Sequence, residues 1–381
     1  KTAFGDKAGF LGIWMEWINN VIAVPATLAT ILTTIAFAIS PTFFKHPVHL
    51  FLSMAALYWG CTFLNCYGIK LSSKLNIIGA LLGTLLPGIL IIGLGCYWML
   101  SGHPFASYHN HRALLGNLAF LISAISGYSG MQITAFHGPD VENPKQQFPL
   151  ALTLACIAII FISLGTALSM SAILPASKIN LVNGVIESFA MFFALFHLSW
   201  LTPILALAIA LGAIACLSAW LIGPARGMHA AAMNNNLPAY FKPVNRHGMP
   251  TRLLITQGII ATGLMSLYLF LPSITEAFWF LVVITSQFTI LMYLMVFASV
   301  IKLEKRLALK IAATLGIITL AIGFTVGLKI PAKLGIENPW HYALAVAGAD
   351  IFILALPLLL KYAFRIPSFA NRLKISKARE Q

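Results

Sequence analysis

Seven consecutive residues with mostly small or polar side chains, Ser126-Gly127-Tyr128-Ser129-Gly130-Met131-Gln132, interrupt a long apolar segment. Two glycines weaken a helix, and the neighbouring hydroxyls can bond to the backbone groups that a break leaves free. Within a membrane, such a break occurs only where the freed groups line a cavity, and the positive end of a half-helix there can hold a carboxylate. The alternative interpretation is a close-packed face of small residues between helices.

The segment Gly127-Tyr128-Ser129-Gly130 also fits the short G-x-S-G pattern of intramembrane serine proteases. Such a serine needs a histidine on a neighbouring helix as its base. His137 lies toward the end of the same apolar segment and His197 lies in an outer segment, so neither is in place at mid-membrane. An intramembrane serine hydrolase that uses Ser129 is therefore kept as an alternative function, and we expect that the protein is not an enzyme.

Two carboxylates, Glu16 and Asp350, fall within or at the edge of apolar runs. Buried acids often mark proton or ion pathways in membrane proteins. Glu16 is close to the start of its run, where a side chain can instead reach up to the lipid headgroups. Asp350 lies deeper, in the last run, where packing or a hydrogen bond is the favoured interpretation.

Histidines and cysteines provide no pattern for a metal or a disulfide. His103, His109 and His111 cluster in one loop, where they could sense acid or bind metal, but solvated loop histidines are the simpler interpretation. All five cysteines fall inside predicted spans without the spacing of a zinc site or a disulfide framework: Cys61, Cys66, Cys96, Cys156 and Cys216. The sequence predicts no metal site and no cofactor.

The composition defines the elements that must position these residues. Apolar residues make up 59% of the 381 positions and charged residues 9%, against roughly 45–50% and 25% in soluble domains. Charge-free runs of about 20 residues recur, and alternating strand patterns are absent, so we expect membrane-spanning α-helices. The sequence predicts ten of them, at 9–39, 48–69, 75–100, 113–136, 149–174, 199–222, 252–272, 275–301, 309–329 and 341–362.

The net charge of +14 indicates a lipid partner and not a nucleic acid, because the basic residues lie in short loops between the apolar runs. If the N-terminus is cytoplasmic, 19 of the 24 Lys and Arg residues lie inside, as the positive-inside rule requires. We therefore expect a multi-pass protein of the inner (plasma) membrane with both termini cytoplasmic. Residues 180–197 are expected to form an interfacial or re-entrant outer helix.

Three regions of the sequence, each made of one or more short stretches, resemble one family of transporters. Gly223-Pro224-Ala225-Arg226-Gly227-Met228, Asn234-Asn235-Asn236-Leu237-Pro238 and Met249-Pro250-Thr251 resemble the loop after the eighth helix of amino acid-polyamine-organocation (APC) transporters. Gly130-Met131-Gln132 through Val141-Glu142-Asn143-Pro144 resembles the sixth helix and the loop after it. Leu174-Pro175, Ile179-Asn180-Leu181 and Gly184-Val185 look like the glutamate/GABA antiporter branch. The similarity runs from near Gly9 to near Lys361.

This resemblance implies the all-α APC/LeuT-type inverted-repeat fold of twelve helices, in which helices one to five and six to ten are inverted repeats. The ten predicted helices would match helices 3–12, in a single transmembrane domain over residues 1–362 that lacks the first two family helices. Residues 363–381 would form a basic cytoplasmic tail. Since the chain opens with Lys1 instead of Met, we expect further sequence upstream.

The resemblance also assigns site positions. Tyr128, Gly130 and Gln132 match those of the sixth helix, while Cys216 and Trp220 match those of the eighth. With the break itself, the predicted substrate-binding set is Ser126, Gly127, Tyr128, Gly130, Gln132, Cys216 and Trp220. The glutamate/GABA antiporter has acids where Gln132 and Cys216 stand, so the resemblance leaves glutamate specificity and its acid dependence open.

The function implied is secondary active transport of a small amino acid by alternating access, in the manner of an amino acid antiporter. Besides the hydrolase, a truncated and inactive membrane protein is an alternative. The residues do not identify the amino acid, the choice between antiport and proton symport, or the oligomeric state.

Overall fold

The computed structural model describes residues 1–40, 44, 46–67, 77–103, 118–132, 141, 143–174, 179–271, 273–329 and 339–363. Within these ranges the regular secondary structure is helical. Nine helical segments are long and apolar enough to cross a membrane: Gly5–Ile39 (α1), Pro47–Asn65 (α2), Ile77–Leu100, Gln146–Ile173, Leu201–Met233 (α9), Thr251–Phe270, Ile274–Leu303 (α12), Leu307–Gly327 (α13) and Trp340–Pro357. They confirm nine of the ten predicted helices.

Several of these segments are subdivided or longer. The third contains a π-turn, η2 (Leu81–Leu85), followed by α4 (Leu86–Leu100). The fourth lies within α7 (Pro144–Ile173), and the last lies within α14 (Pro339–Ala363). Residues 251–270 form α10 (Thr251–Met265) and α11 (Leu267–Phe270).

Three shorter helices complete the described chain. The predicted helix at 113–136 is described only over residues 118–132, where α6 (Phe120–Gly127) stops after eight residues. The outer segment predicted at 180–197 forms α8 (Gly184–Leu195), which is too short to span a membrane. A 3-10 turn, η4 (Ala239–Phe241), lies between α9 and α10.

Helix α9 corrects one predicted boundary. The Gly223-Pro224 pair suggested an end near residue 222, but the helix continues to Met233 with Pro224 inside it. Gly223, Pro224 and Ala225 are all buried. Proline persists inside a membrane helix where neighbouring helices pack closely against it, and small flanking residues allow that approach.

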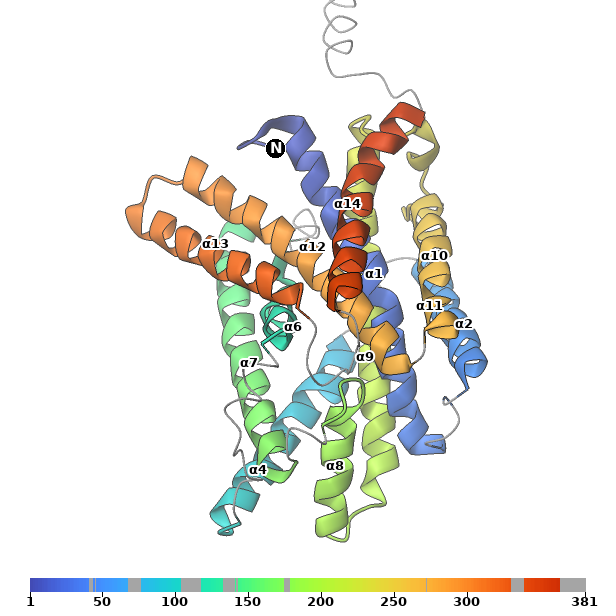
Figure 1. The fold of residues 1–381 in the computed structure, drawn as a ribbon, viewed down its shortest axis with the longest axis vertical. Helices are drawn as coiled ribbons and strands as arrows, with labels where there is room; N and C mark the ends of the chain where they lie inside the picture. The colour runs from blue at the N-terminus through green and yellow to red at the C-terminus, as the bar shows by residue number, and fades with distance from the viewer. Residues whose placement is uncertain are drawn as a thin grey trace, which may run out of the picture.

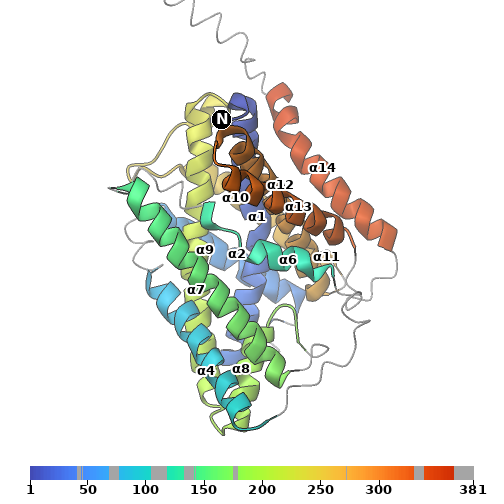
Figure 2. The ribbon, with the colours of Figure 1, turned by 90° about the vertical axis from the view of Figure 1, so that its left-hand side faces the viewer.

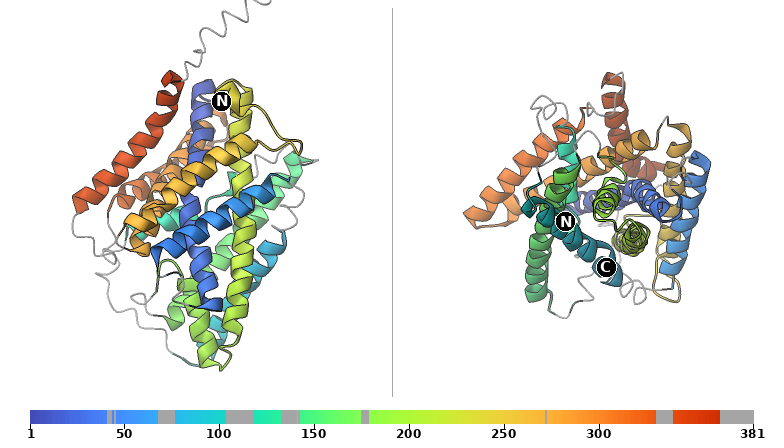
Figure 3. Two further views of the ribbon diagram at one scale, coloured as in Figure 1. Left: turned by 90° about the vertical axis from the view of Figure 1, so that its right-hand side faces the viewer. Right: turned by 90° about the horizontal axis from the view of Figure 1, so that it is seen from below.

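Helix α1 is the centre of the molecule. It packs along α9 and α12 and also contacts α10 and α2. Seen along the long axis, α1 and α9 lie side by side near the middle, with α2 at one edge (Figure 3). The main apolar core lies between these helices and includes Trp17, Leu28 and Phe288. Figure 1 shows that α1 begins, and α9 and α14 end, at the same end of the molecule, while α8 lies at the other end.

Helices α4 and α7 form a pair on one flank (Figure 2). This pair meets α9 through η2, where Gly83 lies against Gly212 so closely that a Cβ on either residue would overlap the other's backbone. Only glycine permits such an approach. The short helix α6 lies against α12 and α13 instead, so the chain at Gly127 faces the middle of the molecule.

Candidate functional site

The break predicted near residue 127 is confirmed. Helix α6 ends at Gly127, and the next two amides donate to carbonyl groups only three residues back, Tyr128 to Ile125 at 3.3 Å and Ser129 to Ser126 at 2.9 Å. Gly130 then has φ +112°, a conformation that favours glycine. The Ser129 hydroxyl donates to the Ser126 carbonyl at 2.6 Å, as expected of a hydroxyl that satisfies a freed backbone group.

Gln132 is the hub of the site. Its side-chain carbonyl accepts the Tyr293 hydroxyl at 2.6 Å and the Gly130 amide at 2.9 Å. Its side-chain nitrogen donates to both carboxylate oxygens of Glu16, at 3.1 Å each. One neutral amide therefore joins α1, α12 and the end of the broken helix, and all of its polar atoms are engaged.

Glu16 is buried, with 3% of its surface exposed. The interpretation that its side chain reaches up to the lipid headgroups was therefore wrong. Its position at the start of an apolar run drew attention to it, but the partner that holds it, Gln132, lies 116 residues away in the sequence. No signal in the sequence joins the two.

Gln132 stands between two cavities. One of about 250 Å³ lies between α1 and α12 and reaches from Lys1 to Glu16 and Gln132. The other, of about 500 Å³, is mostly apolar and is lined by Tyr128, Ser129 and Met131 together with residues of α7, α12 and α13. Gln132 and Val296 line both. A small solute in either cavity would contact the break directly.

Trp220 covers the break from the side of α9. A methyl group on Gly130 would lie 3.2 Å from carbons Cζ2 and Cη2 of the indole, so the ring already rests against the glycine. Gln257 fixes α9 at this level, because its nitrogen donates to the Leu221 carbonyl at 3.1 Å while its oxygen accepts the Trp17 indole N–H at 3.1 Å. The backbone next to Trp220 is thus tied to α10 and, through Trp17, to α1.

The structure brings only part of the predicted set together. Gly130, Gln132 and Trp220 meet, Tyr128 lines the larger cavity, and Gly127 ends the helix. The Ser126 hydroxyl is buried without a hydrogen-bond partner. Cys216 is exposed and lines neither cavity at the break, but its side chain forms a hydrogen bond with that of Trp220.

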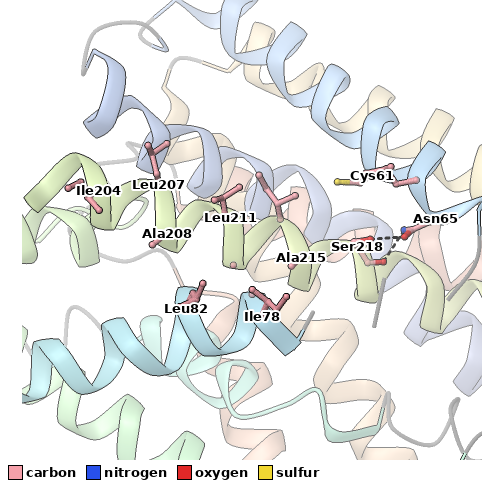
Figure 4. A pocket seen from close by; sticks show the side chains of 14 residues that line it. Cys61, Asn65, Ile78, Leu82, Ile204, Leu207, Ala208, Leu211, Ala215 and Ser218 are labelled. Atoms are coloured by element: carbon pink, nitrogen blue, oxygen red, sulfur yellow. Dashed lines mark hydrogen bonds between the residues drawn. The ribbon is translucent and has the colours of Figure 1, made fainter. Parts of the chain in front are cut away.

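The other face of α9 borders a third cavity, of about 540 Å³, between α2, the start of the third span and α9 (Figure 4). Its walls are aliphatic, including Leu82 and Leu211. One polar pair closes its end: the Ser218 hydroxyl donates to the Asn65 side-chain oxygen at 2.6 Å, and the Asn65 nitrogen donates to the Ser218 carbonyl at 2.9 Å. Since each group satisfies the other, this cavity offers a solute little polar chemistry.

Neither the hydrolase nor a metal site gains support from the described residues. The Ser129 hydroxyl donates a hydrogen bond to the Ser126 carbonyl. Within the described ranges no histidine lines the cavity beside it, and His137 lies outside those ranges. Of the three loop histidines, His103 stacks on Trp98 with 4.0 Å between the ring centres, while His109 and His111 fall outside the described ranges. The described part of the chain groups no metal-ligating side chains.

Comparisons with known proteins agree with this geometry. An amino acid permease family model matches residues 1–349. An uncharacterized transporter of Legionella pneumophila is 35% identical over 379 residues, covering 94% of this chain and 82% of its own length. A glutamate/gamma-aminobutyrate antiporter of Lactococcus lactis is 30% identical over 271 residues, 69% of this chain and 54% of its own. A cadaverine/lysine antiporter of Escherichia coli is 24% identical over 269 residues, 70% and 58% respectively. The chain thus spans little more than half the length of the two antiporters.

Proposed function

Because the chain belongs to the amino acid permease family, we propose that it exchanges small amino acids or amines across the inner membrane by alternating access. The chain is a multi-pass membrane protein of a transporter family and not an enzyme. One observation supports the site of exchange. Just after the break at Gly127, Gln132 bonds to α1 and α12, and Trp220 rests on Gly130.

In this proposal the substrate binds beside residues 126–132, with its carboxylate or amine on freed backbone groups next to Gln132. The Gln132 amide already bonds to Glu16, Tyr293 and Gly130, so it contacts the substrate only when one of these partners is released. Because the amide is neutral and both donates and accepts, it then suits either group without adding charge. Trp220 covers the apolar part of the substrate and excludes water. We propose exchange of the glutamate/GABA-antiporter type, since one similar protein carries that name; another is named for cadaverine and lysine.

Uptake into liposomes tests this proposal. Trp220→Ala should lower uptake by the reconstituted full-length protein at least about tenfold, because truncation removes the cover over the substrate, whereas Trp220→Phe should keep most of it. A matched control is Trp59→Ala on α2, whose indole N–H donates to Thr262 at 3.2 Å, far from the break in sequence and outside both cavities there. Uptake per folded protein should stay within about twofold of the parent in that variant.

The assay uses a panel of amino acids and of amines such as cadaverine and putrescine. Unchanged uptake of every accepted substrate in Trp220→Ala would remove Trp220 from the site. A folded full-length protein that exchanges none of the panel would favour the inactive-protein alternative.

We also propose that both termini are cytoplasmic, because 19 of 24 basic residues then lie inside. Val244, which is 47% exposed between α9 and α10, provides the test. In a cysteine-free background, Val244→Cys should resist an impermeant maleimide applied to intact cells and react after the membrane is opened. Labelling from the periplasmic side of intact cells would reverse the orientation.

A further inference from the structure

Glu16 carries a charge that the proposed site does not explain. Its carboxylate is buried in α1, and the side chain that holds it is the neutral amide of Gln132. Within the described ranges no Lys, Arg or His forms an ion pair with it, and Lys1, which lines the same cavity, pairs with Asp6 at 2.8 Å. A buried carboxylate without a cation is costly, so it tends to take up a proton or to mark an ion pathway.

A path of small side chains leads to this carboxylate. Ala8, Gly9 and Gly12 lie on the α1 face that ends at Glu16, since positions 8, 12 and 16 are each one helical turn apart. They line the cavity of about 250 Å³ that reaches from Lys1 to Gln132. A Cβ on Gly12 would meet no atom within 4 Å, so the path is open at its middle. It begins at the end of the molecule where α1 begins (Figure 1).

Few other groups could titrate in place of Glu16. Tyr293 on α12 faces it through Gln132, and Lys1 lines the cavity. The remaining titratable or charged side chains that the structure describes on the helices packed against α1 form neither a hydrogen bond nor an ion pair with Glu16: His49, Tyr58 and Cys61 on α2, Cys216, Arg226 and His229 on α9, Arg252 on α10, Glu276 and Lys302 on α12, and His341, Tyr342 and Asp350 on α14.

We propose that Glu16 is a proton-binding site of the transport cycle, loaded along the Ala8–Gly12 face of α1, and that its protonation weakens the contact between Gln132 and α1. This inference rests on the proposed function. The proton comes from hydronium in the surrounding water, which enters through the cavity, and it adds to one carboxylate oxygen and leaves a neutral water molecule. The carboxylate accepts with both oxygens, whereas the acid presents one O–H donor. That donor opposes an N–H of Gln132, so one of the two contacts is lost and the broken segment loosens between the two cavities.

Neutralising Glu16 tests the proposal. The parent should exchange substrate faster at about pH 5 than at about pH 8, because the protonated fraction of one carboxyl rises about tenfold per pH unit until it saturates. Glu16→Gln presents a donor to Gln132 at every pH, so its rate per folded protein should be independent of pH, with the proton flux that accompanies uptake lost. Asp350→Asn is the matched control, since Asp350 is also buried but lines neither cavity, and it should keep the parent's pH profile.

Two outcomes would overturn the proposal. Glu16→Gln could keep the parent's pH dependence, which would place the proton site elsewhere. It could instead lose exchange at every pH while binding substrate at least about tenfold more weakly, which would make Glu16 a ligand of the substrate.

A second variant leaves Glu16 in place. Gly12→Leu fills the middle of the path and should slow exchange at acidic pH at least about fivefold, whereas Gly60→Leu on α2, where an added Cβ also meets no atom within 4 Å, should not slow it. Equal rates for Gly12→Leu and Gly60→Leu would refute the path.

Infrared titration separates this inference from the proposed function. On acidification of the substrate-free parent, the C=O bands of protonated carboxyl groups should include one component, the Glu16 band, that is missing in Glu16→Gln and kept in Asp350→Asn. If the parent exchanges no substrate but shows this band, the proposed function fails while proton binding stands. Exchange without the band in the parent refutes the proton site alone.

Discussion

The described part of the chain contains two buried carboxylates, each held by one glutamine, in settings that differ. Glu16 is 3% exposed and accepts from Gln132 with both oxygens. Asp350 is 5% exposed, and the Gln287 amide, oriented with its nitrogen toward the acid, donates to both of its oxygens. The first pair lines a cavity at a broken helix, whereas the second joins two continuous helices, α12 and α14, outside both cavities at the break. The same kind of carboxylate–glutamine pair therefore lies in two different surroundings, and we expect the surroundings to determine its role.

The partners of the two amides sharpen the contrast. The Gln132 oxygen accepts from Tyr293 and from the Gly130 backbone, so this pair holds three segments together. Near Asp350, the contact one turn along α14 is the Trp14 indole N–H donating to the Ile353 carbonyl at 3.2 Å, which joins α1 to a regular helix. Changes in the first pair should alter transport, and changes in the second should alter stability.

Removing the amides should produce the largest difference. Gln132→Ala leaves the Glu16 carboxylate, the Tyr293 hydroxyl and the Gly130 amide without their partner, so uptake per folded protein should fall about 100-fold or more. Gln287→Ala should lower the free energy of unfolding by about 3 kcal/mol with normalised uptake within about threefold of the parent. Liposome uptake and thermal unfolding in detergent measure the two effects. Similar uptake losses in both variants would erase the distinction.

Replacing each glutamine by glutamate should give the two pairs different responses to pH. In Gln132→Glu, two carboxyls share one site and one must stay protonated, so exchange should be weak at neutral pH and rise about tenfold per unit as the pH falls. Gln287→Glu should leave the pH profile of exchange unchanged. Its melting temperature should instead fall as the pH rises, because the folded state must then bury a second charge beside Asp350. A pH series of uptake and of melting tests both, and an unchanged uptake profile in Gln132→Glu would contradict the first.

A methyl group near each pair should have opposite effects. Gly130→Ala places a Cβ at φ +112° and 3.2 Å from the Trp220 ring, which should cost about 1–3 kcal/mol and reduce uptake about tenfold. Gly348→Ala, two residues before Asp350 in α14, meets no atom within 4 Å and should stabilise the helix by up to about 1 kcal/mol without changing uptake. Melting temperatures and uptake measure both effects. If Gly130→Ala kept the stability and uptake of the parent, the break would be able to accommodate a Cβ at this position.

Single hydrogen bonds should give the smallest effect. Tyr293→Phe removes the 2.6 Å bond to Gln132, worth about 1 kcal/mol, and should lower uptake about fivefold because it loosens the hub. Trp14→Phe removes the bond to the Ile353 carbonyl and should lower stability by a similar amount without a change in uptake per folded protein. If Tyr293→Phe lowered stability without lowering uptake per folded protein, the bond between Tyr293 and Gln132 would have a structural role, like the bond of Trp14.

The sequence predicted the parts of this molecule that depend on local composition. Apolar runs located nine spans, and Gly127 and Gly130 located the break, because helix propensity and hydropathy are properties of short windows. Asp350 was expected to take part in packing or a hydrogen bond, and it is buried and accepts from the Gln287 amide when the amide nitrogen faces it. The continuation of α9 past Pro224 was missed because tertiary packing overrides the tendency of a Gly-Pro pair to end a helix.

The hub of the site could not be predicted in this way. Gln132 bonds to Glu16 across 116 residues and to Tyr293 across 161, and no local pattern encodes such a pairing. The resemblance assigned Gln132, Trp220 and Cys216 to the site, and Cys216 is exposed while its side chain bonds to that of Trp220. Position along a helix alone does not say which face meets a neighbour once helices tilt and break.

The contact between Gly83 and Gly212 has a mechanical consequence. Helix α7 packs chiefly on α4, and this pair meets α9 at η2, where two glycine backbones touch without interlocking side chains. Because each glycine leaves room only for the backbone of the other, the α4–α7 pair approaches α9 more closely here than larger residues would allow. Any larger residue at either position would push the pair away from α9 at this contact.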